Sequence, residues 1–248
     1  MKFKTLAFAA ATSLLFSGAA FAQDATPPAN PPPAAAAPAA EPMPAYTLAF
    51  NVGAATDYSF RGISQTNGNP EGFAGVDLTV GKFYGGLWTS NVNFGPFGDD
   101  KTKEELDIYG GVRPTFGNLT VDIGGIFYSY IHNPGHTNYG EVYGKGTYAM
   151  GPFTVGASVF YSPQFPAQTG HAWYYEGNAA WTMDKWTVSG AVGRQTIEKS
   201  SDYTTWNLGV TYAINKTVSL DVRYWDTDVH DFGQVYHARV IGTLKATF

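Results

Sequence analysis

After residue 45, hydrophobic and polar residues alternate with period two, the pattern of β-strands with one apolar and one polar face. One run places Leu48, Phe50 and Val52 on the same face, and a later run separates Glu105 and Asp107 from their apolar neighbours. Strands are expected at residues 46–60, 72–81, 83–94, 104–114, 119–130, 139–149, 153–162, 171–182, 186–197, 203–213, 217–227 and 235–248.

The connections between these strands are alternately short and long. Short ones are expected at 81–82, 116–118, 150–152, 184–185 and 215–216, and longer polar ones at 61–71, 95–103, 131–138, 163–170, 198–202 and 228–234. Transmembrane β-barrels show this asymmetry, with short periplasmic turns and longer outside loops. The sequence therefore predicts an all-β fold, a transmembrane antiparallel up-and-down β-barrel of about 12 strands with both termini periplasmic.

Composition supports a barrel wall rather than a soluble domain. Charged residues make up 14% of the chain, whereas soluble domains carry about 25%. Beyond the first 22 residues, no apolar run has the length of about 18 residues that a spanning helix needs. Aromatic residues crowd the predicted strand ends, where barrel girdles meet lipid headgroups. We expect these girdles to include Tyr58, Phe60, Phe83, Tyr84, Tyr128, Tyr130, Phe153, Tyr161, Trp173, Trp181, Trp186, Tyr212 and Trp225.

The N-terminal region predicts export to the cell outer membrane. Lys2 and Lys4 precede an apolar stretch, and Ala20-Phe21-Ala22 forms an A-x-A cleavage site, so residues 1–22 are expected to be a cleaved signal peptide. Residues 23–45 are rich in proline and alanine and predict a disordered spacer. A docking site for a periplasmic or cell-wall partner is the other interpretation of this segment. The barrel itself is expected over 46–248.

The segment at residues 57–66, DYSFRGISQT, resembles the signature of the TorF family of proteobacterial outer-membrane porins, and the segments at 87–92, 105–111 and 221–227 agree with it. The resemblance implies a barrel but no particular substrate. The terminal Phe248 resembles the recognition signal of the bacterial barrel-assembly machinery. Expected partners are therefore outer-membrane lipid, that machinery and periplasmic chaperones.

The polar face of a barrel lines its lumen, so charged residues on that face are the candidate functional residues. They are Asp57, Arg61, Asp77, Glu105, Asp107, Arg113, Asp122, Glu141, Lys145, Glu176, Asp221, Arg223, Arg239 and Lys245. Asp57 and Arg61 are expected to pair near the mouth on the loop side. The charges could select a small hydrophilic solute in a pore, or they could neutralise one another and plug a small barrel.

Other chemistry has weaker support. His132, His136, His171 and His230 fall in loops without a preset geometry, and Asp226, Asp228 and Asp231 lack the terminal glutamate of a calcium loop, so we predict no metal and no cofactor. No G-x-S-x-G motif, phosphate-binding glycine loop or basic cluster is present, so neither an enzyme nor a nucleic-acid-binding protein is expected.

These observations predict a porin-like outer-membrane barrel that allows passive diffusion of small hydrophilic solutes through a charged lumen. The alternative is a closed structural or adhesive barrel without conductance, and a lipid-modifying barrel enzyme comes third.

Overall fold

The structure is a computed structural model that describes residues 46–94, 102–132 and 137–248. The predicted signal peptide and spacer lie outside the described residues, as do His136 and parts of two predicted loops, 95–101 and 133–136. In the described segments, no helix is long and apolar enough to cross a membrane.

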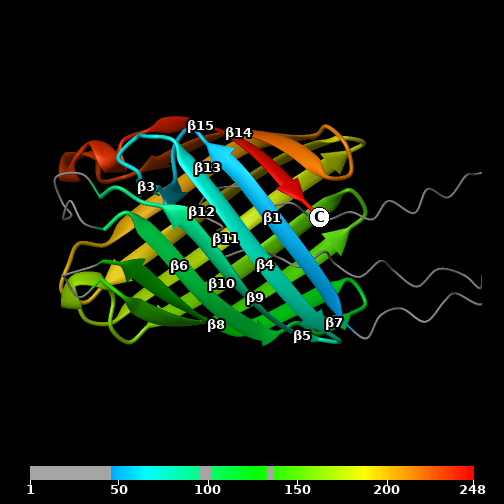
Figure 1. Ribbon diagram of the computed structural model, residues 1–248, viewed down its shortest axis with the longest axis horizontal. Helices are drawn as coiled ribbons and strands as arrows, with labels where there is room; N and C mark the ends of the chain where they lie inside the picture. Colours follow the sequence, from blue (N-terminus) through cyan, green and yellow to red (C-terminus); the bar gives the residue numbers. More distant parts are fainter. Residues whose placement is uncertain (1–45, 95–101, 133–136) are drawn as a thin grey trace, which may run out of the picture.

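Within the described part of the chain, twelve long antiparallel strands form a closed barrel, and they run obliquely around its wall (Figure 1). The long strands are β1 Thr47–Ala55, β4 Glu71–Val80, β5 Phe83–Asn91, β6 Glu104–Val112, β8 Leu119–Ile131, β9 Tyr139–Met150, β10 Phe153–Ser162, β11 Ala172–Met183, β12 Trp186–Ile197, β13 Tyr203–Ala213, β14 Val218–Thr227 and β15 Arg239–Thr247. Each long strand pairs with the next one along the chain, and β1 pairs with β15 to close the barrel. The predicted all-β, antiparallel up-and-down barrel and its strand number are confirmed.

The connections have the predicted two lengths, and they define two ends of the barrel. The turn end carries the short connections, among them the tight turns at Gly81 and Gly151 with φ of 60° and 61°. Glycine tolerates this left-handed conformation, which two-residue hairpin turns require. β7 (Thr115–Phe116) extends the β6–β8 connection at this end. The other end, the loop end, carries the long connections, including short 3₁₀ segments at Pro166–Gln168, His230–Phe232 and Gln234–Tyr236.

Two predicted strands differ most from the structure in extent, and both differences lie at the loop end. The first predicted strand, 46–60, ends at Ala55, and residues 59–64 form a separate hairpin of β2 (Ser59–Phe60) and β3 (Ile63–Ser64). The last predicted strand, 235–248, begins only at Arg239, because residues 234–236 adopt a 3₁₀ turn. In both segments, tertiary contacts inside the barrel replace the pairing that alternation alone suggested.

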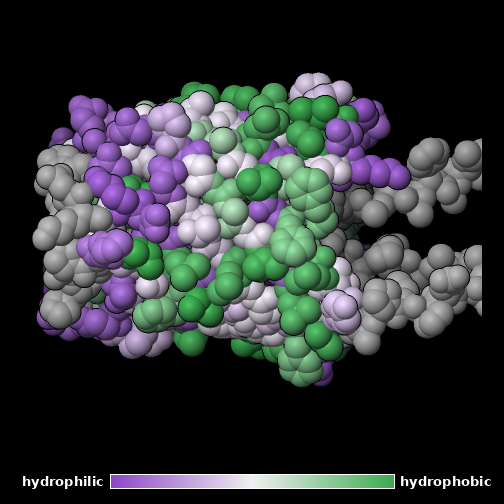
Figure 2. Space-filling model, in the orientation of Figure 1, coloured by the Kyte–Doolittle hydropathy of each residue, from purple (hydrophilic) through white to green (hydrophobic). Residues whose placement is uncertain are grey.

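Alternation separates an apolar outer face from a polar inner face. On β1 the side chains of Leu48, Phe50 and Val52 are half exposed, whereas Asn51 between them is buried. On β11, Tyr174 and Glu176 are buried and their neighbours point outward. Figure 2 shows hydrophobic residues over much of the barrel wall and hydrophilic residues gathered at the loop end. The outer face thus has the surface that a hydrocarbon environment favours.

Candidate functional site

The barrel interior holds the charged residues that the sequence singled out. Ten of the fourteen are buried, and Arg113, Lys145, Arg239 and Lys245 are partly buried, so none is exposed to the outside. Glu71, which falls in a predicted loop, and Asp226, which falls in an acidic stretch without the terminal glutamate of a calcium loop, are buried as well. Glu71 stands at the loop end of β4 with inward parity, the signal that could have identified it, whereas Asp226 on β14 has the outward parity of Tyr224.

Most interior charges are paired with an opposite charge on the same strand, on a neighbouring strand or across the lumen. Arg113 lies 2.8 Å from Asp122, and Arg223 lies 3.1 Å from Asp221. Arg223 also donates hydrogen bonds to Ser189 and to the side chain of Asn207, so it ties β14 to β12 and β13. These contacts form a fixed polar lining on that part of the wall.

The expected pair between Asp57 and Arg61 does not form. Arg61 lies 2.7 Å from Glu141 on β9, and Asp57 lies 2.9 Å from Arg239 on β15. The prediction is wrong because it assumed that both residues share one face of a continuous strand. They belong instead to the segment between β1 and β4, where the chain turns sharply at Arg61, with φ of 48°, and Gly62, with φ of 83°.

This segment, residues 57–66, folds into the barrel at the loop end, and we call it the inner hairpin. Its Asp57 carboxylate accepts hydrogen bonds from Ser64 Oγ at 2.6 Å and from Thr66 Oγ1 at 2.7 Å, and these bonds brace the two arms. The side chains of Tyr58, Ser59 and Thr66 within it are completely buried. The inner hairpin is the segment that resembles the TorF signature.

The inner hairpin contacts the wall at several separated strands. Arg61 donates to Gln195 Oε1 on β12 at 2.8 Å, in addition to its bonds with Glu141. A Cβ atom added to Gly62 would lie 2.2 Å from Thr205 Oγ1 and 2.8 Å from Thr227 Cγ2, so the backbone packs directly on β13 and β14. The hairpin therefore reaches across part of the lumen and narrows it.

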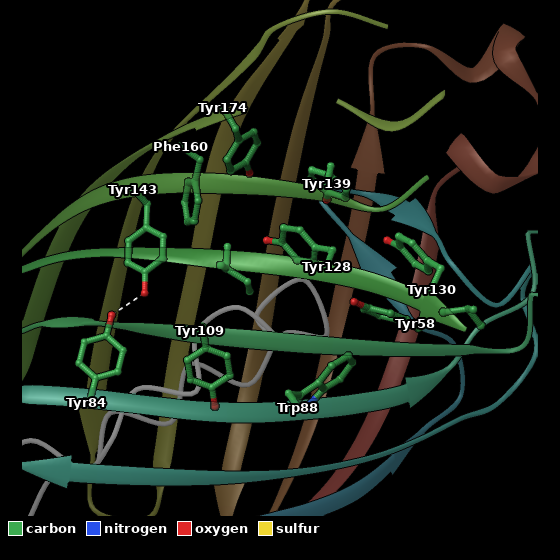
Figure 3. Packing of buried hydrophobic residues seen from close by; sticks show 12 residues of the cluster. Tyr58, Tyr84, Trp88, Tyr109, Tyr128, Tyr130, Tyr139, Tyr143, Phe160 and Tyr174 are labelled. Carbon is green, nitrogen blue, oxygen red and sulfur yellow. Dashed lines mark hydrogen bonds between the residues drawn. The ribbon is translucent and has the colours of Figure 1, made fainter. Parts of the chain in front are cut away.

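Aromatic side chains, most of them tyrosines, cover the inner face of the wall from β5 to β11 (Figure 3). Several of their hydroxyl groups donate to interior carboxylates: Tyr84 to Asp122 at 2.7 Å, Tyr109 to Asp77 at 2.6 Å and Tyr174 to Glu176 at 2.8 Å. Each hydroxyl thus holds an acidic side chain in a defined orientation.

Part of the predicted aromatic girdle is wrong. Tyr58, Tyr84, Tyr128, Tyr130 and Trp225 are buried inside the barrel, and Phe60 packs against this inner cluster. Others do face outward; exposed members are Phe83, Phe153, Trp173, Trp181 and Trp186. Whether an aromatic residue near a strand end faces the lumen or the outside depends on its place in the alternating pattern of that strand.

His132, His171 and His230 lie on separate loops, although the ring centroid of His230 is 5.1 Å from that of His237. In the described residues, no group of three or more histidine, aspartate and glutamate side chains could hold a metal ion. His171 lies 2.9 Å from Glu198, and His230 lies 2.6 Å from Asp226, which also accepts from Tyr224. His136 lies outside the described residues.

Comparison with solved structures places the barrel among outer-membrane porin folds. A KdgM porin aligns with a TM-score of 0.59 and 10% identity over 81% of this chain and 99% of its own. A NanC porin aligns with a TM-score of 0.56 and 10% identity over 82% of this chain and 99% of its own. An outer-membrane channel of the COG4313 type from Pseudomonas putida F1 aligns with a TM-score of 0.51 and 9% identity over 84% of this chain and 96% of its own.

Sequence comparison is less informative about function. No curated protein matches the chain. One family profile matches residues 39–248, and its description does not carry the TorF name. Because this match covers most of the sequence, the chain belongs to the family described as bacterial protein of unknown function, Gcw_chp.

Proposed function

We propose that this protein is a porin-like barrel of the outer membrane that lets small hydrophilic solutes diffuse passively through a charged lumen. The observation that carries the proposal is the separation of faces: the predicted lumen charges are inside a closed barrel whose outer face presents exposed leucine, valine and phenylalanine side chains. The shared fold with porins supports it. No substrate follows from these neighbours, whose identity to this chain is near 10%.

The proposed orientation follows the general rule for such barrels, with the turn end in the periplasm and the loop end outside. Both ends of the barrel sheet, the start of β1 and the end of β15, lie at the turn end, where Phe248 donates a backbone hydrogen bond to Phe50 at 2.8 Å. In this proposal the signal peptide directs export. Phe248 is read by the assembly machinery after periplasmic chaperones have delivered the chain, and the barrel acts without enzymatic chemistry. The resemblance of residues 57–66 to TorF-family porins is consistent with it.

Within this function, the inner hairpin is the proposed constriction. It places Arg61 between Glu141 and Gln195, and the guanidinium lies 4.3 Å from the ring centroid of Tyr174 and 5.0 Å from that of Phe160. A solute entering from the loop end would pass beside this side chain. The constriction would favour small solutes over large ones.

The same hairpin favours one alternative function, a closed structural or adhesive barrel. If the tyrosine-lined wall and the hairpin fill the lumen, the protein would present its loops without conducting. This alternative predicts a folded barrel with no passage, whereas the porin proposal predicts a passage of limited radius.

Planar-bilayer recording of the full chain purified from membranes tests the proposal. Discrete current steps, together with liposome swelling in small sugars but not in larger oligosaccharides, are the expected result. A heat-modifiable, strand-rich barrel that stays silent in repeated insertions would reject the porin function and support the closed barrel. Recovery of the exported chain as a soluble periplasmic species would reject both.

A further inference from the structure

Three buried carboxyl groups meet at the loop end of the interior: Glu71, Glu105 and Asp107, named here the loop-end carboxylates. Glu105 and Asp107 are two residues apart on β6 and share its inner face. Ser90 of β5 lies opposite Glu105 in the sheet, and its hydroxyl donates to Glu71 of β4 at 3.1 Å. Three adjacent strands thus bring the three groups together, and none is more than 3% exposed.

No basic side chain of the described residues forms an ion pair with the loop-end carboxylates. The nearby guanidinium groups are engaged elsewhere, Arg61 with Glu141 and Arg239 with Asp57. Tyr58 donates to Glu105 Oε1 at 3.2 Å. The other Glu105 oxygen, one oxygen of Glu71 and both oxygens of Asp107 are buried without a well-placed donor among the described residues, and the neighbouring Glu105 and Asp107 carboxyl groups interact with each other.

The interior as a whole also contains more acidic than basic side chains. Nine carboxylates face six basic groups when Glu71 is added to the predicted lumen charges. Four of the carboxylates have an arginine partner, and Lys145 and Lys245 interact electrostatically with Glu176 and Asp77. The remaining negative charge is concentrated in the loop-end carboxylates.

Aromatic rings border these carboxylates. Trp88 lies opposite Asp107 in the β5–β6 register, and its ring centroid is 5.6 Å from that of Tyr58. The face of an aromatic ring attracts cations, most strongly for tryptophan. The carboxylates and the ring faces therefore both favour a positively charged solute at this place.

A buried carboxylate without a cationic partner is unfavourable unless a cation accompanies it or a proton neutralises it. In a narrow passage with low-dielectric walls, a negative lining raises the local concentration of cations and repels anions. We infer that the passage prefers cations and small cationic solutes to anions, and that the loop-end carboxylates are its selectivity determinants. The inference rests on the proposed porin function.

The test is the reversal potential of the full chain in a planar bilayer under a KCl gradient. The expected result is a preference for K⁺ over Cl⁻ that moves toward unity in Glu105→Gln and Asp107→Asn, amide variants of nearly the same shape. Glu104→Gln is the matched control, because Glu104 precedes Glu105 on β6 but is exposed on the opposite face. Its selectivity should equal that of the unmodified protein.

A second measurement needs no variant and covers the case in which an amide substitution prevents folding. Liposomes that contain the protein should swell faster in lysine than in glutamate, two solutes of similar size and opposite charge. Currents that prefer Cl⁻, faster entry of glutamate, or selectivity unchanged in both folded amide variants would overturn the inference and leave the porin function standing. A silent unmodified barrel would instead remove the function on which the inference rests.

Discussion

Arg61 and Glu141, 80 positions apart in the chain, form an ion pair with 2.7 Å between Nη2 and Oε2, and each side chain is only 2% exposed. The pair joins the tip of the inner hairpin to the wall strand β9. Glu141 also accepts from Tyr128 at 3.2 Å, so the carboxylate is shared between the hairpin and the tyrosine-lined wall. This contact makes the position of the hairpin testable.

Arg61→Ala should enlarge the passage and destabilise the barrel. Removing the guanidinium leaves Glu141 buried without its cation, an effect of about 3–5 kcal/mol in buried pairs. We expect a higher single-channel conductance and a lower free energy of unfolding in urea.

Two further variants serve as controls for Arg61→Ala. Arg61→Ala/Glu141→Ala should recover part of the lost stability, because no unpaired charge remains. Arg194→Ala breaks a half-exposed pair with Asp202 at 3.5 Å and should change stability by less than about 1 kcal/mol. Equal conductance in Arg61→Ala and the unmodified protein would show that the hairpin does not limit the passage.

Gly62→Ala should displace the inner hairpin. The residue has φ of 83°, and the added Cβ would lie 2.2 Å from Thr205 Oγ1. Gly68→Ala is the matched control, since Gly68 has φ of 74° but no atom within 4 Å of the same position. Backbone strain alone should destabilise the control by about 1–3 kcal/mol. A larger loss of stability and a changed conductance in Gly62→Ala alone would locate the effect in the packing on β13.

Leu208→Arg should impair membrane insertion. Leu208 is 62% exposed near the middle of β13, on the outer face. A basic residue facing lipid at mid-membrane depth costs about 2–4 kcal/mol in such barrels. Ser201→Arg, on the exposed loop between β12 and β13, is the control and should fold like the unmodified protein. Folding into vesicles, followed by heat-modifiable mobility, measures both; equal yields would argue against lipid on this face.

Phe248→Ala should lower the amount of assembled barrel in cells while leaving detergent refolding intact. The side chain of Phe248 is 71% exposed, so its removal disturbs little packing, whereas its backbone bonds to Phe50 remain. Phe116→Ala removes another exposed aromatic side chain at the turn end and serves as the control. Normal assembly of Phe248→Ala would exclude this residue as the recognition signal.

The sequence alone predicted the wall of the barrel, because the face to which a strand side chain points depends only on its place in the local alternation. Leu48 and Phe50 face outward and Glu105 and Asp107 inward for the same reason: successive side chains of a strand point to opposite faces. The same rule places Phe83 outside and Tyr84 inside, although both were expected in the girdle.

The inner hairpin could not be predicted in this way. Residues 57–61 continue the alternation of β1, so the pattern gives no reason to end the strand at Ala55. The strand ends because residues distant in the chain, Glu141, Gln195 and Thr205, contact the hairpin and stabilise its inward fold. The sequence Arg61-Gly62 is compatible with a tight turn, but it does not specify the direction in which the turn folds.

The pairing of β1 with β15 has a consequence for biogenesis. The seam of the cylinder joins the first and last strands, and Phe50 and Phe248 exchange backbone hydrogen bonds across it. Until the final strand arrives, any partial sheet exposes two edges whose amide and carbonyl groups cannot be left bare in hydrocarbon. We therefore expect insertion to follow completion of the polypeptide rather than to keep pace with its synthesis, and we expect a chain that ends before β15 to have no stable membrane form.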